Sequence, residues 1–147
     1  MADVHTNRVR SYNMSMIRSK DTKPELIIRR FLFTNGFRFR LHVRILPGKP
    51  DVVLRKLKTA IFVHGCFWHG HEGCKYFVVP KTRTDWWLAK IKGNISNDAK
   101  KKEKLKEIGW NVITIWECSL RFDKRDNTLN ALLNQLCKLK NEFKELN

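Results

Sequence analysis

The chain has 147 residues, the length of one domain, and its 42% hydrophobic content is enough to build a core around a single sheet. Its 30 lysines and arginines against 14 acidic residues give a formal net charge of +16, which argues against an enzyme of small metabolites and indicates a polyanionic partner. The chain has no apolar run near the roughly 18–20 residues of a membrane span and begins with no hydrophobic signal segment, so we expect a cytoplasmic protein without a membrane partner.

The first third of the chain predicts an arm followed by a helix. Residues 1–12 carry arginines but no apolar periodicity, which is typical of a basic N-terminal arm that orders on its partner. A helix is expected from Asp21 to Gly36, with Asp21 or Thr22 as its N-cap. Glu25 then falls in the first turn, where the helix dipole favours an anion.

The middle of the chain predicts a mixed sheet. Residues 37–43 (FRFRLHV) alternate between apolar and polar, and two short β-rich runs, DVVLR and TAIFV, follow the turn ILPGKP. These three runs predict an antiparallel meander. Residues 85–107 are mostly helix formers, interrupted at Gly93 and Asn94, and lead through Gly109 to the strand WNVITIW. A strand, a helical crossover and a strand predict a parallel pair.

The last segment, residues 129–146, predicts a second long helix. Its leucines recur at helical spacing, so this helix is expected to pack over the sheet. Cys137 adjoins the leucine stripe and is interpreted as a core residue and not as a metal ligand.

Histidines and cysteines concentrate in residues 64–74 (HGCFWHGHEGC). In a cytoplasmic chain such cysteines favour metal ligation over a disulfide framework. Structural zinc takes four sulfur or nitrogen ligands, commonly a local cluster and a contribution from a second element. Cys66, His71 and Cys74 form such a cluster, and Cys118 follows the strand WNVITIW as the fourth ligand. A set of reduced core thiols is the alternative, but the three glycines of the segment make it poorly suited to burial.

A second kind of chemistry is interleaved with these ligands. Asp51 begins one predicted strand and His64 ends the next, so the meander would bring them together. An aspartate suits Mg²⁺, which keeps several positions for water and phosphate. Phosphodiester hydrolysis needs an activated water, a metal and a proton-transfer group, and imidazole suits the last task. The alternative is that Asp51 is simply a turn residue after Pro50.

Aromatic residues supply a third signal. Phe67 and Trp68 lie in the glycine-bracketed loop, and Trp86 and Trp87 follow the polar stretch KTRTD. Exposed aromatics near basic residues can wedge between bases or stack on them, which we favour over core packing for Trp68. The two tryptophans of the strand WNVITIW are expected in the core.

An ordered series of motifs closely resembles the very short patch repair (Vsr) DNA mismatch endonucleases. The stretches are LPGKPDVVL, AIFVHGCFWHGH, VPKTRTDWWLAKI with Asn94 and Asp98, and GWNVITIWEC, with MADVH, SYNMS and RSKDTKPE before them. The likeness covers roughly residues 1–120 of the chain. It implies a single endonuclease domain over residues 1–147, with a restriction endonuclease-like α/β fold: a mixed central sheet flanked by helices, with a structural zinc site.

The resemblance also implies an activity and a set of site residues. The reaction would be a Mg²⁺-dependent nick on the 5′ side of the thymine in a T·G mismatch, the product of 5-methylcytosine deamination. The catalytic residues would be a metal-binding aspartate, a general base, a helper at the phosphate or leaving group, and a completing glutamate: Asp51, His69, His64 and Glu25 in that order. The backbone carbonyl of Val63 would share the Mg²⁺, and zinc would take Cys66, His71, Cys74 and Cys118. The implied DNA contacts are Phe67, Trp68, Trp87, Lys90, Asn94 and Met14.

Two departures from the family pattern and two other functions bear on these expectations. Val63 stands where the family pattern has threonine, which is harmless if the carbonyl is the ligand. Glu72 and Gly73 add one residue to the zinc loop, which glycine can accommodate.

The alternative functions are a restriction-type nuclease acting on matched duplex and a non-catalytic, zinc-stabilised DNA-binding module. A monomer is expected, with mismatch-containing double-stranded DNA as its partner and mismatch repair proteins as a further candidate class.

Overall fold

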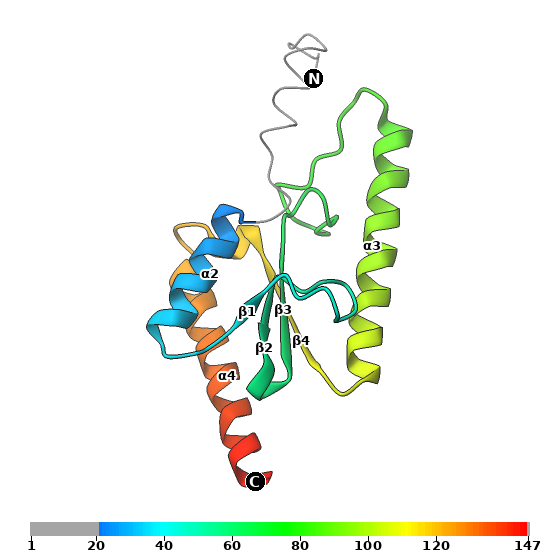
Figure 1. The fold of residues 1–147 in the computed structure, drawn as a ribbon. Helices are drawn as coiled ribbons and strands as arrows, with labels where there is room; N and C mark the ends of the chain where they lie inside the picture. Colours follow the sequence, from blue (N-terminus) through cyan, green and yellow to red (C-terminus); the bar gives the residue numbers. More distant parts are fainter. Residues whose placement is uncertain (1–20, 147) are drawn as a thin grey trace.

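The four strands form one mixed sheet in the order β1-β2-β3-β4 (Figure 1). A computed structural model describes residues 21–146, so the predicted basic arm and Met14 lie outside the described residues. The elements in chain order are α2 (Lys23–Thr34), β1 (Arg40–Leu41), β2 (Val52–Leu54), the 3₁₀ turn η1 (Arg55–Leu57), β3 (Thr59–His64), α3 (Thr84–Glu107), β4 (Asn111–Trp116), the 3₁₀ turn η2 (Glu117–Leu120) and α4 (Arg125–Leu146).

The strand pairing confirms the predicted topology. β1 pairs with β2 and β2 with β3 in antiparallel fashion, and β3 pairs with β4 in parallel after the α3 crossover. The register runs from Thr59 opposite Asn111 to His64 opposite Trp116. Because His64 and Trp116 end their strands side by side, the loop after β3 and the η2 turn after β4 leave the sheet at the same edge.

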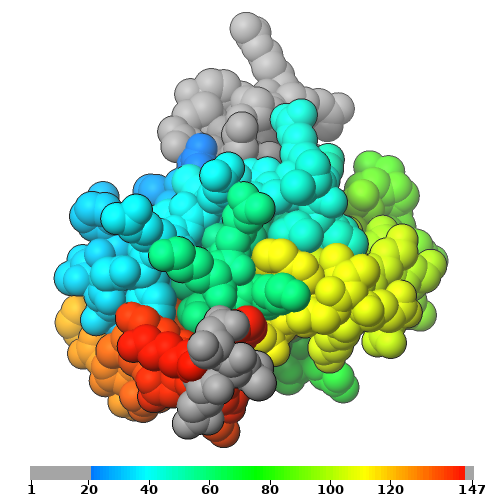
Figure 2. All heavy atoms as spheres, turned by 60° about the horizontal axis from the view of Figure 1, so that its bottom comes forward, coloured from blue at the N-terminus to red at the C-terminus, as the bar shows by residue number. Residues whose placement is uncertain are grey.

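Helices cover both faces of the sheet, in agreement with the predicted fold class. Figure 1 places α2 and α4 on one face and α3 on the other. The larger core cluster joins α2, α4 and the first face, through side chains such as Ile28, Ile61 and Leu136. The smaller cluster, Ala60, Phe62 and Leu105, lies under α3. At the end of the sheet away from the β3–loop junction, the C-terminal part of α4 and the β2–β3 connection lie in contact (Figure 2).

Local signals explain where α2 begins and why β1 is short. Thr22 is the N-cap, and its side-chain oxygen accepts a hydrogen bond from the Glu25 N–H at 3.5 Å. The strand predicted over residues 37–43 is reduced to two residues, and it ends at Leu41 because His42 adopts a left-handed conformation with φ of 48° that a strand cannot continue through.

The long helices correct two expectations. α3 runs without a break through Gly93 and Asn94, because one glycine costs a helix only about 1 kcal/mol and the helix former sequence continues on both sides. Cys137 is exposed, not a core residue. Its neighbour Leu136 is fully buried, and consecutive helical residues are rotated by roughly 100°, which carries Cys137 out of the apolar stripe.

In the part of the chain that the structure describes, no helix combines the length and apolar character of a membrane span.

Candidate active site and metal centre

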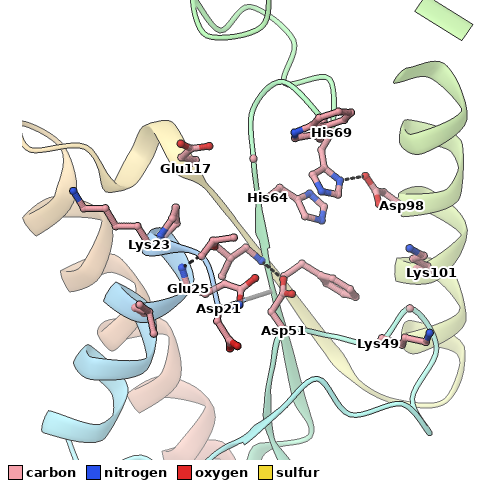
Figure 3. A pocket seen from close by; sticks show the side chains of 18 residues that line it. Asp21, Lys23, Glu25, Lys49, Asp51, His64, His69, Asp98, Lys101 and Glu117 are labelled. Carbon is pink, nitrogen blue, oxygen red and sulfur yellow. Dashed lines mark hydrogen bonds and ion pairs between the residues drawn. The ribbon is translucent and has the colours of Figure 1, made fainter. Parts of the chain in front are cut away.

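A cleft of about 910 Å³ opens where α2 begins, β2 begins and β3 ends (Figure 3). The loop after β3 and one side of α3 complete its walls. Ten charged or ionisable side chains line it, and all of them are labelled in Figure 3: Asp21, Lys23, Glu25, Lys49, Asp51, His64, His69, Asp98, Lys101 and Glu117. Four of these, Asp51, His64, His69 and Glu25, are the predicted catalytic residues, so the fold brings them into one cleft.

Asp51 ties the start of β2 to the end of β3. Its Oδ2 accepts a hydrogen bond from the Val63 N–H at 2.7 Å. Burial raises the pKa of Asp51 above its ordinary value, although the Val63 N–H counteracts this. Glu25 is 2% exposed, and burial together with the negative charge of Asp51 also raises the pKa of Glu25. Two carboxylates destabilised in this way make the cleft a favourable place for a cation.

His64 and His69 stack on each other beside these carboxylates. Their ring centroids are 3.8 Å apart and the rings are nearly parallel, at 3°. His64 is 4% exposed, and among residues 21–146 its Nδ1 has no hydrogen-bond partner. Burial and the neighbouring His69 lower the pKa of His64 to about 3. His64 is therefore a neutral imidazole at pH 7.

Asp98 on α3 orients His69. The His69 Nδ1 lies 2.7 Å from the Asp98 Oδ2, so Nδ1 donates a hydrogen to the carboxylate, and in the neutral imidazole this tautomer leaves the lone pair on Nε2. Burial raises the pKa of Asp98, but the hydrogen bond with His69 and the charges of His69, His64 and Lys101 together leave this pKa below its ordinary value. The sequence-based list of site residues missed Asp98. The motif series that carries the family resemblance includes Asp98 together with Asn94, so a signal for it was present in the sequence.

The four predicted zinc ligands come together in a separate cluster. One ligand atom from each of Cys66, His71, Cys74 and Cys118 lies within 4.8 Å of the other three, so this set could hold a metal ion. The Cys118 Sγ is 3.4 Å from the His71 Nδ1, and the Cys66 Sγ accepts from the Cys118 N–H at 3.4 Å. Burial raises the pKa of the Cys66 thiol to about 12, which disfavours a lone thiolate there.

Glycines shape the loop that carries these ligands. Gly70 has a φ of 58°, and a Cβ at this position would lie 2.6 Å from the Ile95 side chain of α3. The loop can therefore approach α3 closely only with glycine at this position. Gly73, directly before Cys74, has a φ of 74°, a conformation that glycine adopts readily.

Trp116 lies between the two clusters. Its ring stacks on His71 with centroids 4.0 Å apart, and its edge contacts His64 at 5.2 Å. Trp110 packs against the smaller core cluster as expected, whereas Trp116 is half-buried and supports the site residues. The strand pattern could not distinguish these two tryptophans, because His64 and His71, which Trp116 contacts, lie far from it in the sequence.

Three of the predicted DNA-contacting aromatics form one group. Phe67 lies 5.2 Å from Trp68 and 5.4 Å from Trp87, centroid to centroid, and Trp68 lies 5.8 Å from Trp87. The amide nitrogen of Asn94 donates to the Trp68 carbonyl at 2.8 Å, so Asn94 holds this loop against α3. Lys90 is exposed on the same helix. Phe67 and Trp68 directly precede His69 in the loop after β3, and Trp87 lies on α3.

Comparison with known proteins identifies the family. The family described as DNA mismatch endonuclease Vsr matches residues 2–75. The type II nicking enzyme V.NmeAIP of Neisseria meningitidis is 49% identical over 121 residues, which cover 82% of this chain and 86% of that protein. The DNA mismatch endonuclease Vsr of Escherichia coli K12 is 46% identical over 121 residues, 82% of this chain and 77% of that protein. The type II nicking enzyme V.XorIIP of Xanthomonas oryzae is 45% identical over 120 residues, 82% and 88% of the two chains.

The chain belongs to the family of the DNA mismatch endonuclease Vsr. It is accordingly a DNA endonuclease, with the restriction endonuclease-like arrangement of a mixed sheet between helices.

Proposed function

We propose that the chain is a Mg²⁺-dependent mismatch endonuclease that nicks DNA on the 5′ side of the thymine in a T·G mismatch. The observation that carries this proposal is the His69–Asp98 pair, 2.7 Å apart, which lines the same cleft as the Asp51 carboxylate. The aromatic group of Phe67 and Trp68 on the same loop and Trp87 on α3 supports recognition of an unstacked or mismatched base. The net charge of +16 supports a DNA backbone as the partner.

Asp51 and Val63 are the proposed Mg²⁺ ligands. The Asp51 Oδ2 is used by the Val63 N–H, which leaves Oδ1 for a metal. The N–H and C=O of one strand residue lie on the same side of the strand, so the Val63 carbonyl also faces Asp51. Continuing the β2–β3 register past Val52 and Ile61 puts Pro50 opposite Val63, and proline has no N–H to donate to that carbonyl. Because a carbonyl ligand does not depend on the side chain, valine is compatible with this role.

His69 is the proposed general base and His64 the proposed helper. When bound, Mg²⁺ would neutralise the charge that develops on the phosphate and would activate a water molecule. With its Nδ1 hydrogen held by Asp98, His69 presents the Nε2 lone pair to accept a proton. His64, buried and neutral, can donate a hydrogen bond from its ring N–H to a phosphate oxygen or to the leaving group but carries no competing positive charge.

We also propose that the Cys66, His71, Cys74 and Cys118 cluster holds structural zinc. Zn–S of about 2.3 Å and Zn–N of about 2.0–2.1 Å at a tetrahedral angle put sulfur and nitrogen roughly 3.6 Å apart. The Cys118 Sγ and His71 Nδ1 are 3.4 Å apart, close to this value. Four protein ligands leave no open position, which is typical of a structural site.

The organisms of the relatives and the reaction suggest where and how the protein acts. The relatives named above come from bacteria, which supports a bacterial cytoplasmic location beside the chromosome. One strand is cut by one site, so we propose a monomer and a single endonuclease domain.

Comparing T·G with matched duplex tests the proposed substrate. Two labelled duplexes differ only in carrying T·G or C·G at one position of a cytosine-methylation sequence, and both are incubated with protein and Mg²⁺. Nicking is expected only on the thymine strand of the T·G duplex. Equal cutting of both duplexes would instead support a restriction-type nuclease, and binding of a folded, zinc-containing protein without any cut would support a non-catalytic module.

The roles of His69 and Asp98 are tested together. His69→Ala is expected to slow nicking by about 10²- to 10⁴-fold, the range of general base catalysis. Asp98→Asn is expected to slow it less, because the imidazole remains but loses its fixed orientation. If Asp98 acts through His69, adding Asp98→Asn to His69→Ala changes the rate little further. Single-turnover rates of the three variants at saturating Mg²⁺ measure this. Fully additive losses would show that Asp98 acts independently of His69.

A further inference from the structure

Glu25 belongs to a second cluster of charged side chains, which lies on the side of Glu25 away from His64 and His69. The Arg29 Nη2 is 2.7 Å from the Asp21 Oδ1, 3.0 Å from the Glu25 Oε2 and 3.1 Å from the His42 Nε2. Asp21, Glu25 and His42 are themselves a set that could hold a metal ion, with ligand atoms within 4.8 Å of one another. A cationic nitrogen of Arg29 therefore takes the place that a metal would have among them.

This cluster fixes one oxygen of Glu25. The Glu25 Oε2 accepts hydrogen bonds from the Asp21 N–H at 2.9 Å and from the Arg29 Nη2 at 3.0 Å. Among the described residues, every hydrogen bond to the Glu25 carboxylate falls on Oε2. The other oxygen, Oε1, is thereby left for the cleft that Glu25 and Asp51 both line (Figure 3).

His42 connects the cluster to Asp51 through the backbone. The His42 N–H donates to the Asp51 carbonyl at 3.2 Å, while its ring faces Arg29. His42 holds a left-handed conformation, φ 48°, which is uncommon for residues other than glycine and costs roughly 1–3 kcal/mol. The surrounding contacts maintain this conformation, so one residue sets the position of the Asp51 backbone relative to the Glu25 carboxylate.

We propose that Arg29 is the resident cation of the Asp21, Glu25 and His42 cluster, and that it positions Glu25 for the metal-dependent reaction. Glu25 is 2% exposed and the Arg29 side chain is 13% exposed. If either side chain were removed, water could not easily take its place beside the other. An isolated buried carboxylate beside Asp51 would be destabilised by desolvation and by like charge. Together with the Asp21 N–H and His42, Arg29 counters part of both effects through its contact with Oε2, which leaves Oε1 without a hydrogen bond from the cluster. Arg29 is thus a positioning residue and touches no reacting atom.

The inference rests on the proposed nicking activity and on Glu25 completing the catalytic site, and Arg29→Ala tests it against Arg30→Ala. Arg30 is the next residue of α2 and is exposed, so its variant removes the same charge from the same helix without touching the cluster. At saturating Mg²⁺, Arg29→Ala is expected to nick the T·G duplex about 10- to 100-fold more slowly than Arg30→Ala, the usual loss for a residue that supports a metal ligand. Arg29→Lys is expected to recover part of this rate.

Metal binding to the free protein gives a readout independent of activity. With Arg29 removed, two carboxylates and an imidazole remain as ligands that suit Mn²⁺. Electron paramagnetic resonance is therefore expected to count one more bound Mn²⁺ in Arg29→Ala than in Arg30→Ala, and no additional ion in Arg29→Lys. A role confined to packing would not produce this gain.

The outcomes separate this inference from the proposed function. If the wild-type protein does not nick, or if Glu25→Gln nicks at the wild-type rate, the proposed function of the site is wrong. If Glu25→Gln is slow but Arg29→Ala nicks within about twofold of Arg30→Ala, or binds no additional Mn²⁺, the role of Arg29 alone is overturned. Should Arg29→Ala not fold, His42→Asn replaces it, because asparagine tolerates the left-handed conformation. Unchanged nicking by folded His42→Asn would then overturn the inference.

Discussion

Asp51→Asn is expected to slow nicking by about a thousandfold or more while DNA affinity stays close to that of the wild type. A metal that neutralises charge on the phosphate contributes several kcal/mol to the transition state, and about 4 kcal/mol corresponds to roughly a thousandfold in rate. Asparagine has nearly the same shape and its carbonyl can still accept the Val63 N–H, which spans 2.7 Å to Asp51. The local fold is therefore expected to survive, so the loss reports on metal binding.

The measurement is a single-turnover nicking rate, with a separate binding assay in which Ca²⁺ or a chelator replaces Mg²⁺. Glu103→Gln is the matched control, because Glu103 is an exposed acidic residue of α3 outside the cleft. Both variants remove one negative charge, so any general gain in affinity for the DNA backbone is shared. Asp51→Asn nicking as fast as Glu103→Gln would refute the metal role of Asp51.

Cys66→Ala is expected to lose bound zinc and the folded state together. Structural zinc contributes roughly 10–16 kcal/mol of apparent binding free energy in zinc-finger peptides, as much as the roughly 5–15 kcal/mol of net stability of a typical domain. The Cys66 Sγ is buried and contacts Cys118, so its loss breaks the connection between the loop after β3 and the η2 turn. Metal content by atomic absorption and unfolding followed by circular dichroism measure the two losses.

Cys137→Ala is the control for this variant. Cys137 is an exposed free thiol on α4, apart from the cluster, so its replacement should keep one zinc per chain and the wild-type melting temperature. A strong zinc chelator should reproduce the effect of Cys66→Ala in the wild-type chain, whereas omission of Mg²⁺ should stop nicking without unfolding. Full zinc content and normal melting in Cys66→Ala would contradict a structural site at these ligands.

The order of elements was predictable because it depends on local patterns. Alternating and β-branched runs define the strands, and a capping threonine and a final glycine define α2. A strand, a crossover helix and a second strand then favour a parallel pairing, which β3 and β4 form. Where a long-range contact overrides the local pattern, as at His42, the strand prediction was too long.

Much of the candidate site was predictable for a different reason. Metal ligands and catalytic groups come from few residue types, and Asp51, His64, His69 and the cysteine ligands lie at strand ends that the topology must bring together. Their roles remain predictions, to be tested by the variants described above.

The sequence by itself therefore determined the elements, the sheet topology and the ligand chemistry of two clusters. Only the tertiary structure decided which side chains support them. Asp98 reaches His69 because α3 packs across the loop after β3, and Arg29 reaches Glu25 and His42 because α2 begins beside the short strand β1. Such partners are fixed by the rotation and approach of whole helices. These depend on the summed packing of the core and not on any local run of residues.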